Sequence, residues 1–397
     1  MNKNIRISII LPTYNVDKYI ERCIESLEKQ KLDGLEFIFV DDCSSDNSLN
    51  IIKDHAKVDD RFIIIKNNRN SGQGKCRNIG IENARGEFLS FIDPDDYISD
   101  IFYENLYKKA KQVDSDLIKG QRTTIDISEN MHKSNLNRKI INGLNKHIPL
   151  YCLLKSEHQT ILYKKSFIEK HNIKYGNSKV SQDKTFLLRL CLNKPSISFE
   201  ENAEYYYCLN EQSATSDFSY ERCNHELDAL EEIIETAKGF NDSYILKYLQ
   251  DVIKYVFNVY SNVPDEKHSH DFIYRLKTIL FNLSDYKTLS NDFTELEILF
   301  KDDYFIPLKY NNTSVQTIQK WIEYISNNKS EQYLKYFSYV LSYVILINIL
   351  KGNDNSQILK LFNGLDKKDR LQIYRYIPLN VVKLFYKRTK NLFDSFI

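Results

Sequence analysis

Short apolar runs and stretches with helical spacing alternate over the first hundred residues. Continuous apolar runs, which are typical of buried strands, predict strands over residues 5–11, 36–42, 62–65 and 88–92. Apolar residues spaced three and four positions apart predict helices over 16–30, around 49–52 and over 73–84. This alternation predicts an α/β domain with a mainly parallel central sheet, whose ligand crevice lies beyond the carboxyl ends of the strands.

Polar motifs follow three of these strands. The first strand is expected to stop at Pro12, the second ends in two aspartates, and the fourth runs into a cluster of acids. Ser44, Ser45 and Asp46 offer N-caps for the helix after the second strand. Because the carboxyl ends of parallel strands meet at one edge of a sheet, we expect the motifs to lie together. They comprise Pro12, Thr13, Tyr14 and Asn15, then Asp41 and Asp42, then Asp93, Pro94, Asp95 and Asp96.

The acid cluster has two interpretations. Asp93, Asp95 and Asp96 place three carboxylates within four positions, where they repel one another. A divalent ion such as magnesium or manganese would relieve this repulsion, since such ions bind oxygen ligands and are commonly shared with a substrate phosphate. Aspartate and proline are also ordinary turn residues, so a solvated turn explains the same pattern. The cluster by itself leaves both interpretations open.

Two common nucleotide-binding motifs are absent. A dinucleotide-binding domain needs G-x-G-x-x-G after its first strand, where this chain has PTYN. Residues 71–78 contain Gly-Lys, but Arg69 and Cys76 occupy the positions where a P-loop needs glycine and Ser or Thr. These observations exclude a dinucleotide-binding fingerprint and a P-loop.

Composition indicates a folded protein of two domains. The chain has 397 residues, 42% hydrophobic and 27% charged, with a net charge of +1 that gives no general attraction to nucleic acid. Seven scattered cysteines form no C-x-x-C pair, so neither a zinc site nor a disulfide framework is indicated, and a reducing cytosol fits best. The apolar run before Pro12 is too short for a signal-peptide core. A cytoplasmic protein is therefore predicted.

The C-terminal half has a different pattern. Most glycines precede residue 180, and apolar spacing predicts helices over 226–236 and 245–260. Residues 336–350 carry no charge, but a membrane span needs about 20 residues, so a buried core helix is favoured. The tail, 380–397, sets apolar against basic residues. It is either an interfacial helix on an anionic membrane or a helix that docks on the protein's own core.

Three runs together carry a resemblance to a known family. They are SIILPTYN, EFIFVDDCSSDNS and NSGQGKCRNIGIENARGEFLSFIDPDD. In order, spacing and position at strand ends they resemble the N-terminal half of the family 2 inverting glycosyltransferases, whose nucleotide-binding fold is called GT-A. The resemblance covers residues 5 to about 215. It implies a GT-A domain over 1–222, followed by a mainly helical domain over 223–397 for acceptor, membrane or partner binding.

The resemblance also implies roles for the strand-end motifs. Thr13 and Tyr14 would pack and hydrogen-bond around the donor, most often a UDP-sugar, although an ordinary strand-to-helix turn is the alternative. Asp42, with Asp41 beside it, would accept a hydrogen bond from the base. Asp95 is the candidate for direct metal coordination and Asp93 for the ribose or a metal-bound water, with Asp96 as a supporting acid; these assignments could shift by one position. The implied donor-binding set is Pro12, Thr13, Tyr14, Asn15, Asp41, Asp42, Arg77 (near the diphosphate) and Asp93, and the implied metal set is Asp95 and Asp93.

An inverting transfer also needs a base that removes the proton of the acceptor hydroxyl. The family uses the aspartate of a Glu-Asp pair, and residues 179–190 fit that place with Gln182 and Asp183. Asp183 is therefore the predicted base, and the replacement of Glu by Gln is a departure from the family. The alternative is that Asp183 only caps a helix.

Two further segments follow from the same resemblance. Residues 203–215 are similar to the segment that closes the donor site, but Cys208 stands where the family usually has arginine, so Lys184, Arg189 or a C-terminal basic residue would have to replace it. Residues 120–160 lie on the acceptor side by position, with an ordinary surface loop as the alternative.

The resulting functional prediction is metal-assisted transfer of a sugar from a nucleotide-sugar to a hydroxyl of a glycan or lipid-linked glycan. The setting that the resemblance implies is bacterial surface polysaccharide synthesis at the inner face of the cell membrane. The competing prediction is a noncatalytic scaffold whose helical half binds other assembly proteins. The acid pattern of Asp95 and Asp183 argues against that scaffold.

Overall fold

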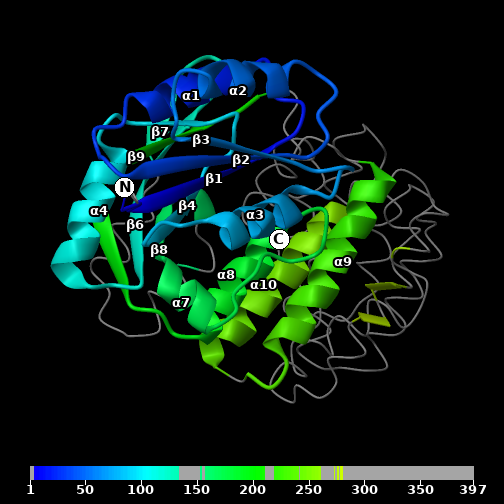
Figure 1. The fold of residues 1–397 in the computed structure, drawn as a ribbon. Coiled ribbons are helices and arrows are strands. Elements are labelled where there is room, and N and C mark those ends of the chain that lie inside the picture. The colour runs from blue at the N-terminus through cyan, green and yellow to red at the C-terminus, as the bar shows by residue number, and fades with distance from the viewer. Residues whose placement is uncertain are drawn as a thin grey trace, which may run out of the picture. The chain divides into compact units, whose positions relative to one another are not determined.

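The computed structural model divides into two compact units, Met1–Asn262 and Val263–Ile397. The predicted core helix at 336–350 and the tail at 380–397 lie outside the described residues. Every element named below belongs to the first unit (Figure 1). The structure describes residues 4–133, 153, 157–210, 219–240, 242–260, 272, 275, 276, 278 and 279.

The strands of the described residues form one mixed sheet in the order β3-β2-β1-β4-β8-β6-β9-β5, with β7 paired to β6 (Figure 1). The four N-terminal strands β3, β2, β1 and β4 are parallel, as predicted, whereas β8 is antiparallel to both β4 and β6. The mainly parallel sheet is thus confirmed for one half and corrected for the other. Polar residues interrupt β6 and β9, so no continuous apolar run marks these strands in the sequence. The strands are β1 (Ile7–Thr13), β2 (Leu35–Asp41), β3 (Phe62–Lys66), β4 (Phe88–Phe91), β5 (Tyr97–Ile98), β6 (Leu117–Ile125), β7 (Met131–Lys133), β8 (Ile161–Lys164) and β9 (Ile197–Cys208).

Helices cover both faces of this sheet. Alternate residues of β1, such as Ile9, share one buried cluster with Ile24 of α1 and Phe102 of α4. On the other face α3 packs against β1, where a Cβ at Gly80 would lie 2.3 Å from Cγ2 of Ile10. Glycine at position 80 therefore permits the close approach of α3 to the first strand. The helices are α1 (Ile20–Glu28), α2 (Ser48–Ala56), α3 (Gln73–Asn83), α4 (Phe102–Val113), α7 (Lys165–Lys170), α8 (Gln182–Leu192), α9 (Tyr220–Ala237) and α10 (Ser243–Tyr260), with a 3₁₀ turn, η1, at His158–Thr160.

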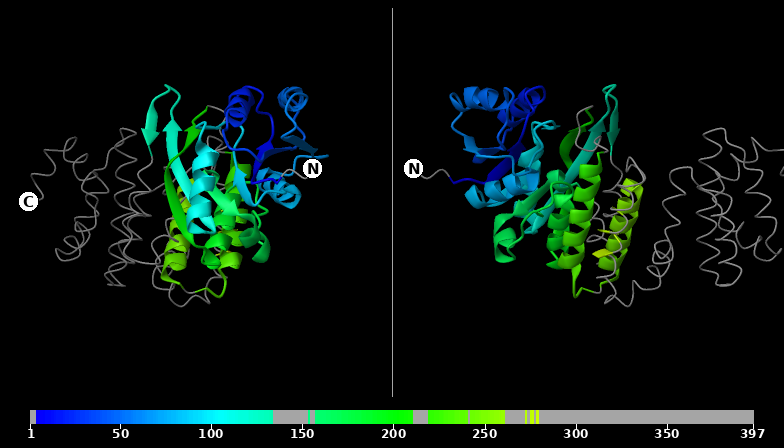
Figure 2. Two further views of the ribbon diagram at one scale, coloured as in Figure 1. Left: turned by 60° about the vertical axis from the view of Figure 1, so that its left-hand side comes forward. Right: turned by 90° about the vertical axis from the view of Figure 1, so that its right-hand side faces the viewer.

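The helices predicted over 226–236 and 245–260 are confirmed as α9 and α10. They lie side by side, and α9 also packs against α8 (Figures 1 and 2). The hydroxyl of Ser219 caps α9 by accepting the N–H of Arg222 at 3.2 Å. The domain boundary proposed after residue 222 falls within α9. Within the described part of the chain, no helix has the length and apolar character needed to cross a membrane.

Two local predictions are corrected. The first strand does not stop at Pro12, because β1 continues through Pro12, paired with Val40, to Thr13. The N-cap residue of α2 is Asn47, and neither Ser44 nor Ser45 occupies that position. Both serines instead hydrogen-bond to the PTYN segment on the neighbouring strand, as described below.

Candidate active site

The three polar motifs meet at one edge of the sheet. β1 lies between β2 and β4, and Thr13 pairs with Asp41 in the parallel register. The Asp42 N–H donates to the Thr13 carbonyl at 2.8 Å, and the Ile92 N–H donates to the Ile10 carbonyl at 3.1 Å. The backbone ladder therefore brings the ends of all three strands together, as the sequence predicted.

The PTYN segment is tied to the segment that follows β2. Asn15 has a left-handed backbone (φ 50°), which asparagine tolerates better than most residues. Its side-chain oxygen accepts the Ser45 N–H at 2.9 Å, and its own N–H donates to the Ser44 hydroxyl at 3.2 Å. Tyr14 is left 45% exposed. These contacts hold the PTYN segment at the sheet edge and leave the ring of Tyr14 exposed.

Asp41 and Asp42 are buried but have different partners. The Asp42 carboxylate accepts the N–H groups of Ser71 (2.9 Å) and Gly72 (2.7 Å), so it organises the loop before α3. Oδ1 of Asp41 accepts the Ser44 N–H at 3.2 Å, whereas its Oδ2 has no hydrogen-bond partner among the described residues. A buried carboxylate oxygen without a donor is costly, so this atom is suited to receive a ligand N–H or O–H.

The three acids after β4 differ in their hydrogen-bond partners. Asp96 is fully buried and accepts the Tyr205 hydroxyl at 2.6 Å and the Cys208 N–H at 2.8 Å. Burial, together with the charges of Asp95 and Asp93, raises the pKa of Asp96 well above its usual range. Asp96 therefore joins β4 to β9.

Asp95 is more open than Asp96. Its Oδ2 accepts the Asn210 side-chain amide at 2.9 Å. Burial and the charge of Asp93 raise the pKa of Asp95 to about 6. A cation bound beside this carboxylate would favour its ionised form.

Asp93 is paired with a buried arginine. Its two oxygens accept hydrogen bonds from Arg77 Nη2 (2.6 Å) and from the Gln159 amide (2.5 Å). Burial alone would raise the pKa of Asp93, but the charge of Arg77, together with the hydrogen bonds from Gln159 and Arg77, outweighs it and holds the pKa below its usual range. Asp93 is therefore a carboxylate anion that faces α3 and η1.

Arg77 has N–H groups that no hydrogen bond among the described residues uses. It is 1% exposed, and its Nη2 reaches both Asp93 and Oε1 of Gln73 (3.4 Å). Its Nε and Nη1 are buried without a partner among the described residues, although its guanidinium lies over the ring of Tyr175 at 5.2 Å. Unpaired N–H groups of a buried guanidinium are the arrangement expected of an anion site.

Asp183 lies in the first turn of α8. The N-cap residue is Ser181, so Asp183 is not the cap that the alternative interpretation required. Asp183 is half-buried, and its charge acts on Arg77 and His158, which also flank Asp93. The amide of Gln182 lies 3.5 Å from Oε1 of Gln73, which links the start of α8 to the Arg77 pair. Asp183 therefore lies within electrostatic range of Arg77 and His158, the two residues that flank Asp93.

Metal ligands are sparse here. Among the described residues, no three His, Cys, Asp or Glu side chains converge to hold a metal ion. Asp96 is hydrogen-bonded to Tyr205 of β9, and Asp93 is paired with Arg77. Asp95 is therefore the carboxylate of this cluster that is suited to a cation. The chemistry of these donors fits a divalent ion held by Asp95 together with ligands from a bound substrate, such as phosphate oxygens.

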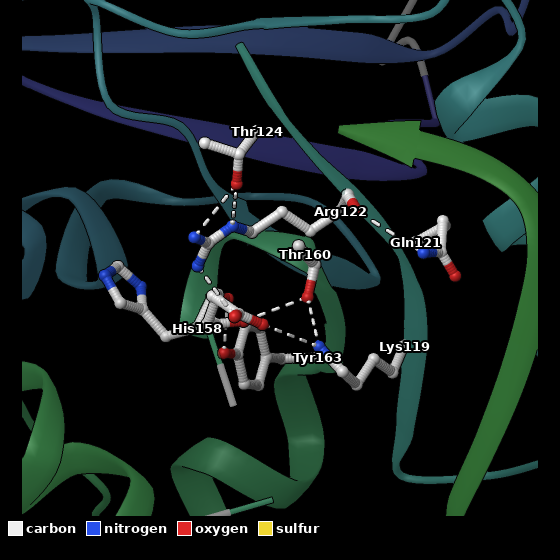
Figure 3. Close-up of polar contacts among 8 residues, drawn as sticks. Lys119, Gln121, Arg122, Thr124, His158, Thr160 and Tyr163 are labelled. Atoms are coloured by element: carbon white, nitrogen blue, oxygen red, sulfur yellow. Dashed lines mark hydrogen bonds and ion pairs between the residues drawn. The ribbon is translucent and has the colours of Figure 1, made fainter. Parts of the chain in front are cut away.

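The acceptor-side segment supports the site through a polar network (Figure 3). Lys119, which is buried, donates to Thr160 Oγ1 at 2.7 Å and lies 3.4 Å from Glu157, whose other oxygen accepts from Arg122 at 2.7 Å. This network holds η1 in place. The middle residue of η1, Gln159, is the one that binds Asp93. Residues 157–160 are therefore connected to Asp93 through Gln159.

His158 is part of the same support. It is buried, and its Nδ1 lies 2.9 Å from the Tyr175 hydroxyl. Its carbonyl accepts the Tyr163 hydroxyl at 2.6 Å (Figure 3). Burial and the charge of Arg77 lower the pKa of His158 to about 4, so the ring is neutral at pH 7. Tyr175 and Tyr205 carry no sequence signal for these contacts, because each partner is distant along the chain.

Neither Lys184 nor Arg189 faces the acid cluster. Lys184 Nζ donates to the Ser181 hydroxyl at 2.8 Å, and Arg189 pairs with Glu232 of α9 at 3.1 Å. These two residues therefore do not take the place of the arginine that Cys208 replaces. Residues 211–218, beyond Cys208, lie outside the described part of the chain.

Comparisons with known proteins agree with this architecture. Residues 8–178 match the family described as Glycosyl transferase family 2. The chain is 30% identical over 211 residues to a putative glycosyltransferase, EpsH, of Bacillus subtilis, a match that spans 51% of this chain and 61% of EpsH. It is also 30% identical over 220 residues to the poly(ribitol-phosphate) beta-N-acetylglucosaminyltransferase TarP of Staphylococcus aureus, spanning 54% of this chain and 66% of TarP. Each match leaves at least a third of the relative uncovered.

A solved structure shares the fold. The crystal structure of S. aureus TarS 1-349 in complex with UDP-GlcNAc matches with a TM-score of 0.58 and 19% sequence identity, over 88% of this chain and 93% of that chain. At this identity the likeness concerns the fold, an α/β GT-A architecture with a curled mixed sheet.

Proposed function

The chain belongs to glycosyl transferase family 2 through residues 8–178, and from this premise we propose that it transfers a sugar, with inversion, from a nucleotide-sugar to an acceptor hydroxyl. The observation that carries the proposal is Arg77: its buried guanidinium has two nitrogens without a hydrogen-bond partner among the described residues, pairs with Asp93, and is acted on by the charge of Asp183. An anion-binding group next to a half-buried carboxylate is what a transfer with a diphosphate leaving group requires.

The donor nucleotide is proposed to bind at the ends of β1 and β2. One side of this proposed site consists of Pro12, Thr13, Tyr14 and Asn15. The exposed Tyr14 ring offers a stacking surface for a base. The Asp41–Asp42 pair recognises the base or ribose, with Oδ2 of Asp41 as the open acceptor. A UDP-sugar is the proposed donor, supported by the UDP-GlcNAc named in the TarS structure, which shares the fold.

The diphosphate is proposed to contact Arg77 through Nε and Nη1. Asp95 is the proposed direct ligand of a manganese or magnesium ion, and Asp93, whose oxygens bind Arg77 and Gln159, contacts the donor side. Such an ion, when bound, neutralises charge that develops on the departing diphosphate. Arg77 acts in the same direction from the protein itself, in a buried site where electrostatic interactions are strong.

The proton is proposed to leave the acceptor hydroxyl for the carboxylate of Asp183. Asp183 stands in the first turn of α8, and the paired acids Asp93 and Asp96 have other partners. Removal of the proton makes the acceptor oxygen a better nucleophile as it attacks the anomeric carbon, and the bond to the diphosphate breaks on the opposite face.

The acceptor is proposed to be a glycan or lipid-linked glycan in the synthesis of a bacterial surface polymer. The support is the relative TarP, a poly(ribitol-phosphate) beta-N-acetylglucosaminyltransferase. The location proposed with this acceptor is the inner face of the cell membrane.

Asp183→Asn tests the proposal. Nucleotide-sugars are incubated with manganese and acceptor, and release of nucleoside diphosphate is measured. We expect kcat to fall about 10²- to 10⁴-fold, the usual contribution of a general base, while calorimetry shows unchanged UDP affinity. Asp54→Asn, on the exposed surface of α2, is the matched control and should leave both quantities unchanged.

Two results would overturn parts of the proposal. Substantial turnover by the Asp183→Asn variant would remove Asp183 as the base. Absence of binding by every uridine nucleotide, measured by thermal shift in the presence of manganese, would remove the UDP-sugar assignment.

A further inference from the structure

Helix α9 contacts the segment that leads into Asp183. This helix follows the part of the chain that matches the family, which ends at residue 178. Three side-chain contacts join it to residues 177–181, and α8, α9 and α10 lie together (Figures 1 and 2). The contacts are Glu232 Oε2 accepting the Asn177 N–H (2.8 Å), the His225 carbonyl accepting the Ser178 hydroxyl (2.8 Å) and Glu226 Oε2 accepting the Ser181 hydroxyl (2.7 Å).

Ser181 is the turning point of this segment. Its φ of 54° lies in the left-handed region, which is costly for a residue with a side chain. Its hydroxyl does not cap α8 but donates to Glu226 and accepts from Lys184 Nζ at 2.8 Å. Because Gln182 and Asp183 follow directly, the backbone of Ser181 sets the direction in which the first turn of α8 begins.

Glu226 is a buried carboxylate surrounded by donors. It is 1% exposed and accepts hydrogen bonds from Tyr255 (2.9 Å) and Arg222 (3.4 Å) in addition to Ser181. Its Oε2 lies 3.9 Å from Lys184 Nζ. A buried carboxylate is tolerated only when such partners compensate its lost hydration.

The charge of Lys184 interacts with two carboxylates, Glu226 and Asp183. Burial lowers its pKa, and the charges of Glu226 and Asp183 oppose that effect. Its Nζ lies 3.6 Å from the centroid of the Tyr255 ring, so the ammonium is directed toward α9 and α10. The lysine stem is long and flexible, and once Glu226 is gone the carboxylate whose charge still acts on the ammonium is that of Asp183.

We propose that Glu226 is a positioning residue for the transfer: it holds Ser181 and Lys184 on the side of α9, so that the carboxylate of Asp183 stays free to accept the proton. This inference rests on the proposed role of Asp183. It assigns the α9–α10 pair a part in the reaction, although this pair lies outside the matched family domain.

Glu226→Gln tests the inference, because it keeps the shape of the side chain and removes its charge. We expect kcat to fall at least tenfold, while the donor Kd from calorimetry stays within twofold of the native value. Glu226→Gln combined with Lys184→Met is expected to recover most of the lost kcat, since the ammonium that captures Asp183 is gone. A purely structural role would not be rescued by a second substitution in the same buried cluster.

Controls separate this effect from unfolding. Glu221→Gln, on the same helix, breaks an exposed pair with Lys179 (3.6 Å) and should leave kcat unchanged. If Glu226→Gln does not fold, Ser181→Gly serves instead, because glycine adopts the left-handed backbone at no cost but lacks the hydroxyl. This variant is expected to lose kcat severalfold with an unchanged donor Kd, and native kcat in it would overturn the inference.

The remaining outcomes are equally decisive. Native kcat in Glu226→Gln, a donor Kd that weakens as much as kcat falls, or failure of Lys184→Met to rescue would each overturn the inference. If the native protein transfers no sugar, the proposed function fails on its own. The crystal structure of the Glu226→Gln variant then tests the positioning directly: Lys184 Nζ paired with Asp183 supports it, and Lys184 still directed at Tyr255 contradicts it.

Discussion

The two sides of the proposed active site are held in different ways. On the donor side, parallel strand pairing aligns the ends of β1, β2 and β4, and Asp42 adds hydrogen bonds to backbone N–H groups. On the base side, the first turn of α8 is held by side chains of α9, above all Glu226. Because the two sides use separate contacts, donor binding and proton removal should be separable by substitution.

Arg77→Met is expected to have the largest effect on donor binding. It removes two unpaired donor groups and leaves half-buried Asp93 without its partner at 2.6 Å. UDP affinity measured by calorimetry should fall about 100-fold, equivalent to about 3 kcal/mol. Arg77→Lys keeps the charge but loses the planar fork, so an intermediate loss is expected. Native UDP affinity in Arg77→Met would exclude contact between Arg77 and the diphosphate.

Asp95→Asn sharpens the assignment of the metal ligand. The variant should lose manganese stimulation of transfer. In the native protein the Asp95 carboxyl, with its pKa raised to about 6, loses most of its negative charge as the pH falls from 7 to 5. Manganese affinity in the presence of UDP should therefore fall about tenfold over that interval. A pH-independent affinity, measured by titration at both pH values, would contradict the assignment.

The same carboxyl makes a prediction about stability. A folded-state pKa above the unfolded value means that Asp95 contributes stability below pH about 4, and that this contribution is lost as the pH rises through about 6. In the absence of metal, Asp95→Asn should raise the free energy of unfolding by about 2 kcal/mol at pH 7 and change it little at pH 4. Urea denaturation at the two pH values measures this, and destabilisation at pH 7 would count against it.

Tyr255→Phe is expected to give the smallest effect and probes the base side alone. It removes the hydroxyl 2.9 Å from Glu226 but keeps the ring beside Lys184. One lost hydrogen bond to a charged group contributes about 1 kcal/mol at this partly exposed position, so kcat should fall two- to threefold with an unchanged UDP Kd. Tyr107→Phe, whose hydroxyl lies 3.5 Å from exposed Glu87, is the matched control. A change in UDP affinity in Tyr255→Phe would show that the two sides are not separable.

Much of the donor side could be predicted because its signals are local. Apolar runs mark β1 to β4, and parallel pairing brings the residues after them to one edge, so Thr13 and Asp41 meet as neighbours in register. The strands β6, β8 and β9 were not predicted, because polar residues interrupt β6 and β9, β8 has only four residues, and their pairing partners lie far along the chain. Helices α9 and α10 were predicted because their apolar spacing is regular.

The sequence by itself determined the α/β pattern and the three strand-end motifs, because each depends on short-range periodicity or on a motif of adjacent residues. Only the tertiary structure decided how neighbouring acids differ. Asp96 is buried against Tyr205, more than a hundred residues away, while Asp95 stays more open. In the same way, only the packing of α9 brings Glu226 to Ser181. The physical reason is that burial and the identity of a hydrogen-bond partner depend on residues that are close in space but distant in sequence.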